Sequence, residues 1–162
     1  MNENKLPPAN IEAEEAILAG ILLDPKAITI VTDILPVEAF FVQSHQQIYQ
    51  AALELHHKNN QVDLMTVSTW LSDHKLLKKV GGQAKLAQLL NCTVSATNID
   101  RYSLLVLDKY QRRRLIAAGH EILDLGYDTS QELETVFDQS EAKIFNITTD
   151  KKDKFSTEPI ID

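Results

Sequence analysis

The sequence predicts an all-α protein, namely a globular bundle of about six helices followed by a long αα-hairpin. The 162 residues include only five glycines and five prolines, and most prolines lie near the ends or between apolar runs, so long helices are permitted. Apolar residues recur at spacings of three and four over most of the chain. A composition of 44% apolar and 24% charged residues is typical of a globular domain with its own core.

Two helices are expected directly after the polar leader that ends at Pro8. Asn10 is the expected N-cap of a helix over residues 11–23, in which apolar residues recur at helical spacing. Asp24 is expected to cap a second helix over residues 25–35, with a proline at its first position. Three glutamates lie in the first turns of the first helix, where the helix dipole favours them: Glu12, Glu14 and Glu15.

The next segment is expected to form a short turn over residues 37–41, with Phe40 and Phe41 both in the core. Ser44 and Gln47 have the spacing of a capping box, which predicts that a third helix begins there. This helix is expected to end in a polar stretch that begins at residue 56.

Two shorter helices complete the predicted bundle. Asp63 or Thr66 is expected to cap a helix that ends near residue 74. The glycine pair at residues 81–82 is a break, and a short helix is expected over residues 85–92. Four nearby side chains are expected in the core: Val62, Met65, Val67 and Trp70.

A long helix without proline is expected from Asn98 to Gly126, where the glycine takes the C′ position. Ser130 offers a cap for a second helix after a short turn. The apolar seam of the first helix, with Gln111 filling one slot, consists of Leu104, Leu107, Leu115, Ala118, Ile122 and Leu125. The seam of the second consists of Leu133, Phe137, Ser140, Ile144 and Ile147.

Further apolar residues lie off these two seams, so the hairpin is expected to need another partner. They are Val106, Ile116, Leu123 and Val136. That partner is either the bundle of the same chain or the hairpin of another copy, and the heptad spacing favours the second. The predicted divisions are a globular head over residues 1–97, a hairpin over 98–149 and a charged linker from 150 to 162, in a chain expected to be part of a longer protein.

The charge balance bears on which partners the chain can bind. A formal net charge of −7 disfavours a protein whose main task is to bind phosphates, which requires an excess of Lys and Arg. One basic cluster, comprising Lys109 and Arg112 to Arg114, leaves open an alternative function as a direct single-stranded DNA-binding module. With Ile116 and Ile122 close by, the same arginines also have the mixed apolar and cationic composition of a protein-binding site.

No pattern for catalysis, a cofactor or a metal ion is found. No glycine-rich phosphate loop precedes a Lys-Ser or Lys-Thr pair, so ATP hydrolysis by this segment is not expected. His56 and His57 are adjacent and face different ways on a helix, whereas His45 and His74 are expected at the surface or at caps. Cys92 is the only cysteine and is expected to be buried. No secretory signal or membrane-length apolar run is present, so a cytoplasmic protein is expected.

Seven short motifs resemble the N-terminal domain of bacterial replicative DNA helicases of the DnaB type. In chain order they are Pro8-x-Asn10-x-Glu12-Ala-Glu14-x-Ala16-x-Leu18-x-Gly20-x-x-Leu23, Phe40 with His45-Gln-x-Ile48-Tyr49, Val62-Asp63-Leu-x-Thr66-Val67, Val80-Gly81-Gly82, Asn98-Ile99-x-x-Tyr102, Arg113-Arg114-Leu115-Ile116 and Ala142-Lys143-Ile144-Phe145. The resemblance spans nearly the whole chain. It implies a helical head and a hairpin that precede a RecA-like ATPase domain.

The resemblance also implies partners. Hairpins of that family pair between subunits, and the N-terminal collar of the hexamer is a trimer of dimers, so this chain is expected to bind itself as a dimer or a hexamer. The collar binds the C-terminal domain of primase, and a helicase loader is a further partner to expect. ATP and Mg²⁺ would bind the ATPase domain beyond Asp162, which would also make most contacts with DNA.

Two sets of candidate site residues follow. The self-association candidates are Leu104, Leu107, Leu115, Ala118, Ile122, Leu125, Leu133, Phe137 and Ile144. The primase-docking candidates are Lys85, Arg113, Ile116 and Ile122. Lys85 lies where some members of the family present an aromatic side chain, so the sequence departs from the family at that position.

Overall fold

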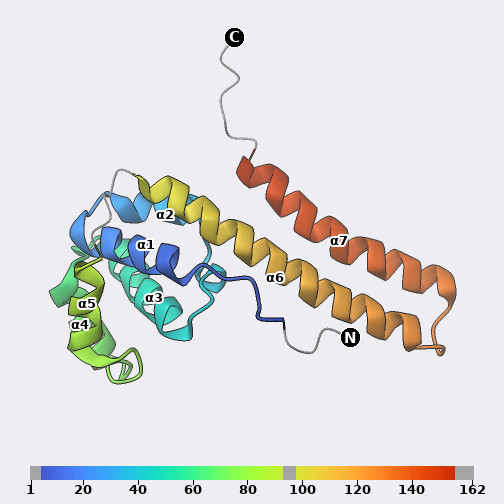
Figure 1. Ribbon diagram of the computed structural model, residues 1–162, viewed down its shortest axis with the longest axis horizontal. Coiled ribbons are helices and arrows are strands. Elements are labelled where there is room, and N and C mark those ends of the chain that lie inside the picture. Colours follow the sequence, from blue (N-terminus) through green and yellow to red (C-terminus); the bar gives the residue numbers. More distant parts are fainter. Residues whose placement is uncertain (1–4, 93–97, 156–162) are drawn as a thin grey trace, which may run out of the picture. The chain divides into compact units, whose positions relative to one another are not determined.

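The computed structural model describes residues 5–92 and 98–155, with side chains to residue 150, and within these ranges it is entirely helical (Figure 1). The predicted all-α fold class is therefore confirmed. Contacts divide the chain into two compact units: Ala9–Tyr110, here called the head, and Met1–Pro8 together with Gln111–Asp162, here called the hairpin unit. The elements are α1 (Ile11–Leu23), α2 (Ala27–Ile34), the 3₁₀ turn η1 (Val37–Ala39), α3 (Gln43–His57), α4 (Leu64–Asp73), α5 (Gly82–Leu90), α6 (Ile99–Tyr127) and α7 (Leu133–Phe155).

The central helix of the head is α1, which contacts α2, α3 and α5. Asn10 caps it as predicted, because its side chain accepts a hydrogen bond from the Ala13 amide at 3.0 Å. Gly20 lies against the start of α6, since a Cβ built on it would be 2.8 Å from Ile99 Cδ1. A side chain at this position would therefore force the end of the Ile99 side chain to shift.

The segment after α1 differs from the prediction in two details. α2 begins at Ala27 rather than at residue 25, because the Asp24 carboxylate accepts the Lys26 amide at 2.9 Å within a turn that precedes the helix. Phe40 is buried and lies 4.9 Å from the ring of Tyr49, whereas Phe41 is 41% exposed. Both phenylalanines were expected in the core, but only Phe40 faces it.

Tyr49 belongs to the same aromatic cluster, and its hydroxyl donates to the Leu35 carbonyl at 2.9 Å. Burial raises the pKa of this phenol above its ordinary value, because the phenolate would lose its hydration. The hydroxyl therefore stays protonated and keeps the end of α2 attached to α3.

The predicted cap of α4 is confirmed and that of α3 is wrong. The Asp63 side chain accepts the Thr66 amide at 2.9 Å, and the Thr66 hydroxyl accepts the Asp63 amide at 3.0 Å, which forms a complete capping box. α3 begins at Gln43 with no side-chain cap, so Ser44 already lies within its first turn.

α5 begins at Gly82, three positions earlier than expected, and ends at Leu90. Gly81 has a φ of 104°, a backbone conformation that residues with a side chain rarely adopt. A Cβ at this position would also lie 2.8 Å from Cβ of Lys85. Of the four core candidates nearby, Val62 and Val67 are buried, Trp70 is half-buried, and Met65 is 76% exposed.

The first turns of α6 belong to the head, so the head extends to Tyr110 rather than to residue 97. The reason is that α6 contributes Ile99, Val106 and Leu107 to the head core. Of the off-seam apolar residues, Val106 thus packs within its own chain. The sequence placed the boundary where the helix begins, but core packing places it within the helix.

Within the hairpin unit, α6 continues through Gly126 to Tyr127, so the predicted C′ role of this glycine is wrong. Ser130 does not cap α7. Instead it donates to the carboxylate of Asp128, as does Gln131 at 3.0 Å. These hydrogen bonds lower the pKa of Asp128 below its ordinary value. α7 ends at Phe155, beyond residue 150 where the linker was expected to begin.

Candidate protein-interaction surface

The two helices of the hairpin unit pack along a narrow inner seam. Ala118 is buried there, and ion pairs lie beside it, with 2.7 Å between Arg114 Nη1 and Asp150 Oδ2 and 3.1 Å between Lys143 Nζ and Glu121 Oε2. Because 114 pairs with 150 and 121 with 143, the helices are antiparallel. The half-buried apolar residues of the seam are Ile122, Leu125, Val136 and Ile147.

The self-association candidates fall into two groups of different burial. Leu107 is buried in the head core, Ala118 is buried in the hairpin seam, and Ile122 and Leu125 are half-buried. The other five are exposed by 39% to 63% of their surface: Leu104, Leu115, Leu133, Phe137 and Ile144. Each of the two seams predicted from the sequence therefore combines inward and outward positions.

Four of these exposed residues lie on one side of the hairpin. An α-helix turns by about 100° per residue. Counted from the inward positions Ala118 and Ser140, Leu115 on α6 is rotated in the same sense as the three exposed residues on α7, which are Leu133, Phe137 and Ile144. Equal rotations on antiparallel helices point to the same side, so Leu115, Leu133, Phe137 and Ile144 form one apolar surface, here called the hairpin face.

Two glycines on α6 lie beside this surface. A Cβ built on Gly119 or Gly126 would meet no atom within 4 Å, so the helix backbone is accessible at both positions. They are seven residues apart and therefore lie on the same side of the helix. A second helix can approach the backbone more closely there than at positions with a side chain.

A further apolar stripe lies on the side of α6 that faces away from α7. It consists of Ile116, Leu123 and Tyr127, which are 48%, 55% and 79% exposed. Exposed apolar residues that share one side of a helix are typical of protein-interaction sites. The hairpin unit thus presents two apolar surfaces in a single chain.

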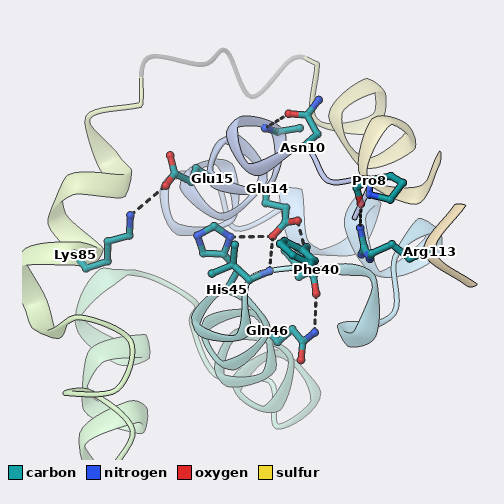
Figure 2. Close-up of polar contacts among 12 residues, drawn as sticks. Pro8, Asn10, Glu14, Glu15, Phe40, His45, Gln46, Lys85 and Arg113 are labelled. Atoms are coloured by element: carbon teal, nitrogen blue, oxygen red, sulfur yellow. Dashed lines mark hydrogen bonds and ion pairs between the residues drawn. The ribbon is translucent and has the colours of Figure 1, made fainter. Parts of the chain in front are cut away.

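The primase-docking candidates are distributed over both units. In the head, Lys85 on α5 forms an ion pair with Glu15 on α1, with 3.1 Å between Nζ and Oε1 (Figure 2). In the hairpin unit, Arg113 donates from Nη1 to the Pro8 carbonyl at 2.7 Å, while Ile116 is exposed and Ile122 is half-buried.

The basic cluster on α6 is engaged within its own chain. Arg114 also donates to the Gln111 amide oxygen at 3.2 Å, in addition to its ion pair with Asp150. Arg112 and Arg113 have further partners as well. Arg113 and Arg114 therefore help to hold the hairpin unit together.

A buried polar cluster in the head was missed by the sequence analysis (Figure 2). The Glu14 carboxylate on α1 accepts the Phe41 amide at 2.9 Å and the Val42 amide at 3.3 Å, and lies 2.9 Å from His45 Nδ1 on α3. Glu14 and His45 are 1% and 2% exposed. Glu14 does lie in the first turn of α1 as predicted, but its buried contacts were not foreseen. The placement of His45 at the surface or at a cap is wrong. These contacts join residues 27 to 31 positions apart in the sequence, so no local pattern indicates them.

The described part of the chain contains no group of three or more His, Cys, Asp or Glu side chains that could hold a metal ion. Cys92 is half-exposed rather than buried. None of the helices in the described ranges has the length and apolar character needed to span a bilayer.

Comparison with known families gives a match over most of the chain. A family model described as the DnaB-like helicase N terminal domain matches residues 6–108. Replicative DNA helicase DnaB of Synechocystis sp. is 59% identical over 143 residues, which cover 88% of this chain and 16% of that protein. Replicative DNA helicase DnaC of Bacillus subtilis is 38% identical over 148 residues, which cover 91% of this chain and 33% of that protein. The chain thus spans no more than about a third of these relatives.

Two solved structures have the same fold. The N-terminal domain of DnaB helicase from Mycobacterium tuberculosis superposes with a TM-score of 0.83 at 31% identity, over 87% of this chain and 99% of that one. A DnaB-like replicative helicase, solved to show its interactions with primase, superposes with a TM-score of 0.71 at 22% identity, over 94% of this chain and 36% of that one.

Proposed function

Because the chain belongs to the family of DnaB-like helicase N-terminal domains, we propose that it is the collar domain of a hexameric replicative DNA helicase. In this role it joins subunits and docks primase at the replication fork, and it performs no catalysis itself. ATP and Mg²⁺ then bind a motor domain elsewhere in the same polypeptide, which also makes most contacts with DNA. The proposed compartment is the cytoplasm, and a helicase loader is a further proposed partner.

The hairpin face is the observation that supports self-association. Leu115, Leu133, Phe137 and Ile144 leave between 45% and 63% of their surface exposed in the single chain. Burying a side chain of this size contributes about 1.5–3 kcal/mol. Gly119 and Gly126 beside it allow a helix of a second copy to approach closely, so a dimer of hairpins is the proposed unit, from which a trimer of dimers is built.

Primase docking is proposed for the apolar stripe of α6 that consists of Ile116, Leu123 and Tyr127, here called the outer stripe. Ile116 lies there 48% exposed on a helix that also includes Arg113, and arginine and large apolar side chains are enriched at the centres of interfaces. Support from a relative is limited to the second solved structure, whose helicase interacts with primase. Binding of single-stranded DNA by Arg112 to Arg114 is a weaker alternative, because these side chains already have partners.

The test compares Phe137→Asp with Phe145→Asp, because both phenylalanines are exposed, by 55% and 67%, but Phe145 points away from α6. Sedimentation velocity across a concentration series should show wild-type dimers or larger species. Phe137→Asp should weaken self-association at least about tenfold, since about 1.4 kcal/mol corresponds to a factor of ten. Phe145→Asp should leave it unchanged. A wild-type chain that stays monomeric throughout would contradict the role of the hairpin face.

Primase docking is measured separately, by titration with the C-terminal domain of the primase of the same organism. Ile116→Asp should weaken this binding at least about tenfold, while Phe137→Asp should affect it only through assembly. If the Ile116→Asp variant bound the primase domain with unchanged affinity, the outer stripe would be excluded as the docking site.

A further inference from the structure

Positive charge is concentrated in one part of an otherwise acidic chain. The sequence contains 23 acidic and 16 basic residues, but residues 74–99 contain no Asp or Glu at all. The same stretch contains Lys75, Lys78, Lys79 and Lys85. The excess of negative charge therefore argues against phosphate binding by the whole surface, but not by this segment.

Three of these lysines project from a well-ordered connection between α4 and α5. The Leu76 and Leu77 amides both donate to the Leu71 carbonyl, at 2.7 and 3.2 Å, and the Gly82 amide donates back to the Leu77 carbonyl at 2.8 Å. Leu76 and Leu77 pack against the head core. The backbone is thus fixed by hydrogen bonds and by apolar packing.

Lys75, Lys78 and Lys79 are all exposed, and among the described residues none forms an ion pair with them. Lys85 differs, because it is paired with Glu15. The three lysines are here called the lysine loop. A fixed backbone with unpaired ammonium groups loses little conformational freedom when it binds an anion, apart from that of the lysine side chains themselves.

An aromatic pair lies directly before the lysine loop. The rings of Trp70 and His74 are stacked, with centroids 3.7 Å apart and planes 15° from parallel. A carbonyl oxygen can only accept, so His74 donates from Nδ1 to the Trp70 carbonyl at 2.8 Å, which fixes the imidazole plane. His74 is exposed, and a hollow of about 440 Å³ borders Trp70. Its lining includes Thr69 and the acidic Asp73, so phosphates are expected at the lysines rather than in the hollow.

We propose that the lysine loop and the Trp70–His74 pair form a contact site for single-stranded DNA on the head. Lys75, Lys78 and Lys79 pair with phosphates, and a base stacks on the exposed side of the imidazole. A positively charged track beside a flat aromatic platform is the combination that binds single strands without sequence preference. An acidic polypeptide would also suit the lysines, but it would leave the stacked rings unused, so DNA is the favoured partner.

This site is distinct from the surfaces proposed for assembly and primase docking. It lies on α4 and the following loop, whereas those surfaces lie on α6 and α7. It also uses different residues from the arginine cluster of α6. Failure of one proposal therefore leaves the other intact.

The experiment uses the full chain and a fluorescein-labelled oligothymidylate. Lys78→Glu/Lys79→Glu is compared with Lys5→Glu/Lys26→Glu, which changes the net charge equally at two other exposed lysines. Three phosphate contacts predict a slope of about −2 when the logarithm of the affinity is plotted against that of the salt concentration. The loop variant should bind at least about tenfold more weakly at low salt and show a shallower slope, while the control should bind like the wild type. Circular dichroism verifies the fold of both.

Stacking is measured through the intrinsic fluorescence of Trp70, the only tryptophan in the chain. Oligothymidylate should quench it, inorganic polyphosphate should not, and His74→Ala should weaken DNA binding about fivefold or more. Absence of binding at low salt, or equal weakening by the loop and control variants, would overturn the site. If polyglutamate bound as tightly as oligothymidylate, and oligothymidylate did not quench the fluorescence of Trp70, the assignment to nucleic acid would be overturned in favour of an acidic polypeptide.

Discussion

At the scale of single residues, Glu14 joins three parts of the head through one buried carboxylate. Its carboxylate is the acceptor for two backbone amides in the connection from η1 to α3 and lies within hydrogen-bonding distance of His45. Loss of this acceptor would leave two part-buried amides without their partner, and an unsatisfied buried donor costs about 1–3 kcal/mol. Gln46 continues the cluster by donating from Nε2 to the Phe40 carbonyl at 2.6 Å.

Glu14→Gln should therefore lower the free energy of unfolding by about 2–3 kcal/mol, because the amide retains one acceptor oxygen but also directs an NH₂ group at buried donors. The neighbouring Glu15→Gln is the matched control. Its ion pair with Lys85 is partly exposed, so this variant should lose less than about 1 kcal/mol. Urea denaturation of both variants gives the comparison, and equal losses would contradict the role of the buried carboxylate.

At the scale of elements, helix starts were predictable only where the cap is a side chain. Asn10 and Asp63 each bond to an amide three residues ahead, so the whole motif is local and visible in the sequence. α3 lacks such a bond, and its start is fixed instead by Glu14, which accepts the amides immediately before it. Ser44 thus resembles a cap in the sequence without acting as one.

Asp63, which caps α4, and Ser44, which does not cap α3, give a paired prediction. Asp63→Ala should lower the free energy of unfolding by about 1 kcal/mol, because two orphan amides at the start of α4 lose their acceptors or their alignment. Asp63→Asn should restore most of this loss. Ser44→Ala should change stability by less than about 0.5 kcal/mol. Thermal unfolding distinguishes these outcomes, and a loss at Ser44 equal to that at Asp63 would show that α3 does have a side-chain cap.

At the scale of the whole molecule, one helix serves two compact units. Ile99, Ser103, Val106 and Leu107 are buried within the head, and the Ser103 hydroxyl donates to the Ile99 carbonyl at 2.7 Å. The rest of α6 packs against α7 and leaves apolar residues exposed. The first turns of α6 are thus required for the head to fold, and the later turns remain available for other chains.

Two truncations test this division. The fragment Ala9–Tyr110 should unfold cooperatively and remain monomeric, because it retains the complete head core and lacks the hairpin face. A fragment over residues 9–97 should fail to fold, since it lacks Ile99, Val106 and Leu107, whose burial contributes about 5–9 kcal/mol together, comparable to the stability of a whole domain. Circular dichroism melts and sedimentation velocity measure both. A cooperative transition in the shorter fragment would place the boundary at residue 97 after all.

The sequence by itself determined the helices and the family. The 3–4 spacing of apolar residues, the scarcity of glycine and proline, and the local caps at Asn10 and Asp63 predict helical segments, because a helix is built from hydrogen bonds between residues four positions apart. The motifs along the chain indicated the family that the comparisons then showed.

Only the tertiary structure decided which side of each helix is buried and where the units divide. Phe40 and Phe41 are adjacent and equally apolar, yet only Phe40 meets the core. Glu14 and His45 meet across 31 positions, and the head takes the first turns of a helix whose later turns belong to the hairpin. These outcomes depend on contacts between residues far apart in the chain, and periodicity along one helix contains no information about which neighbour will cover it.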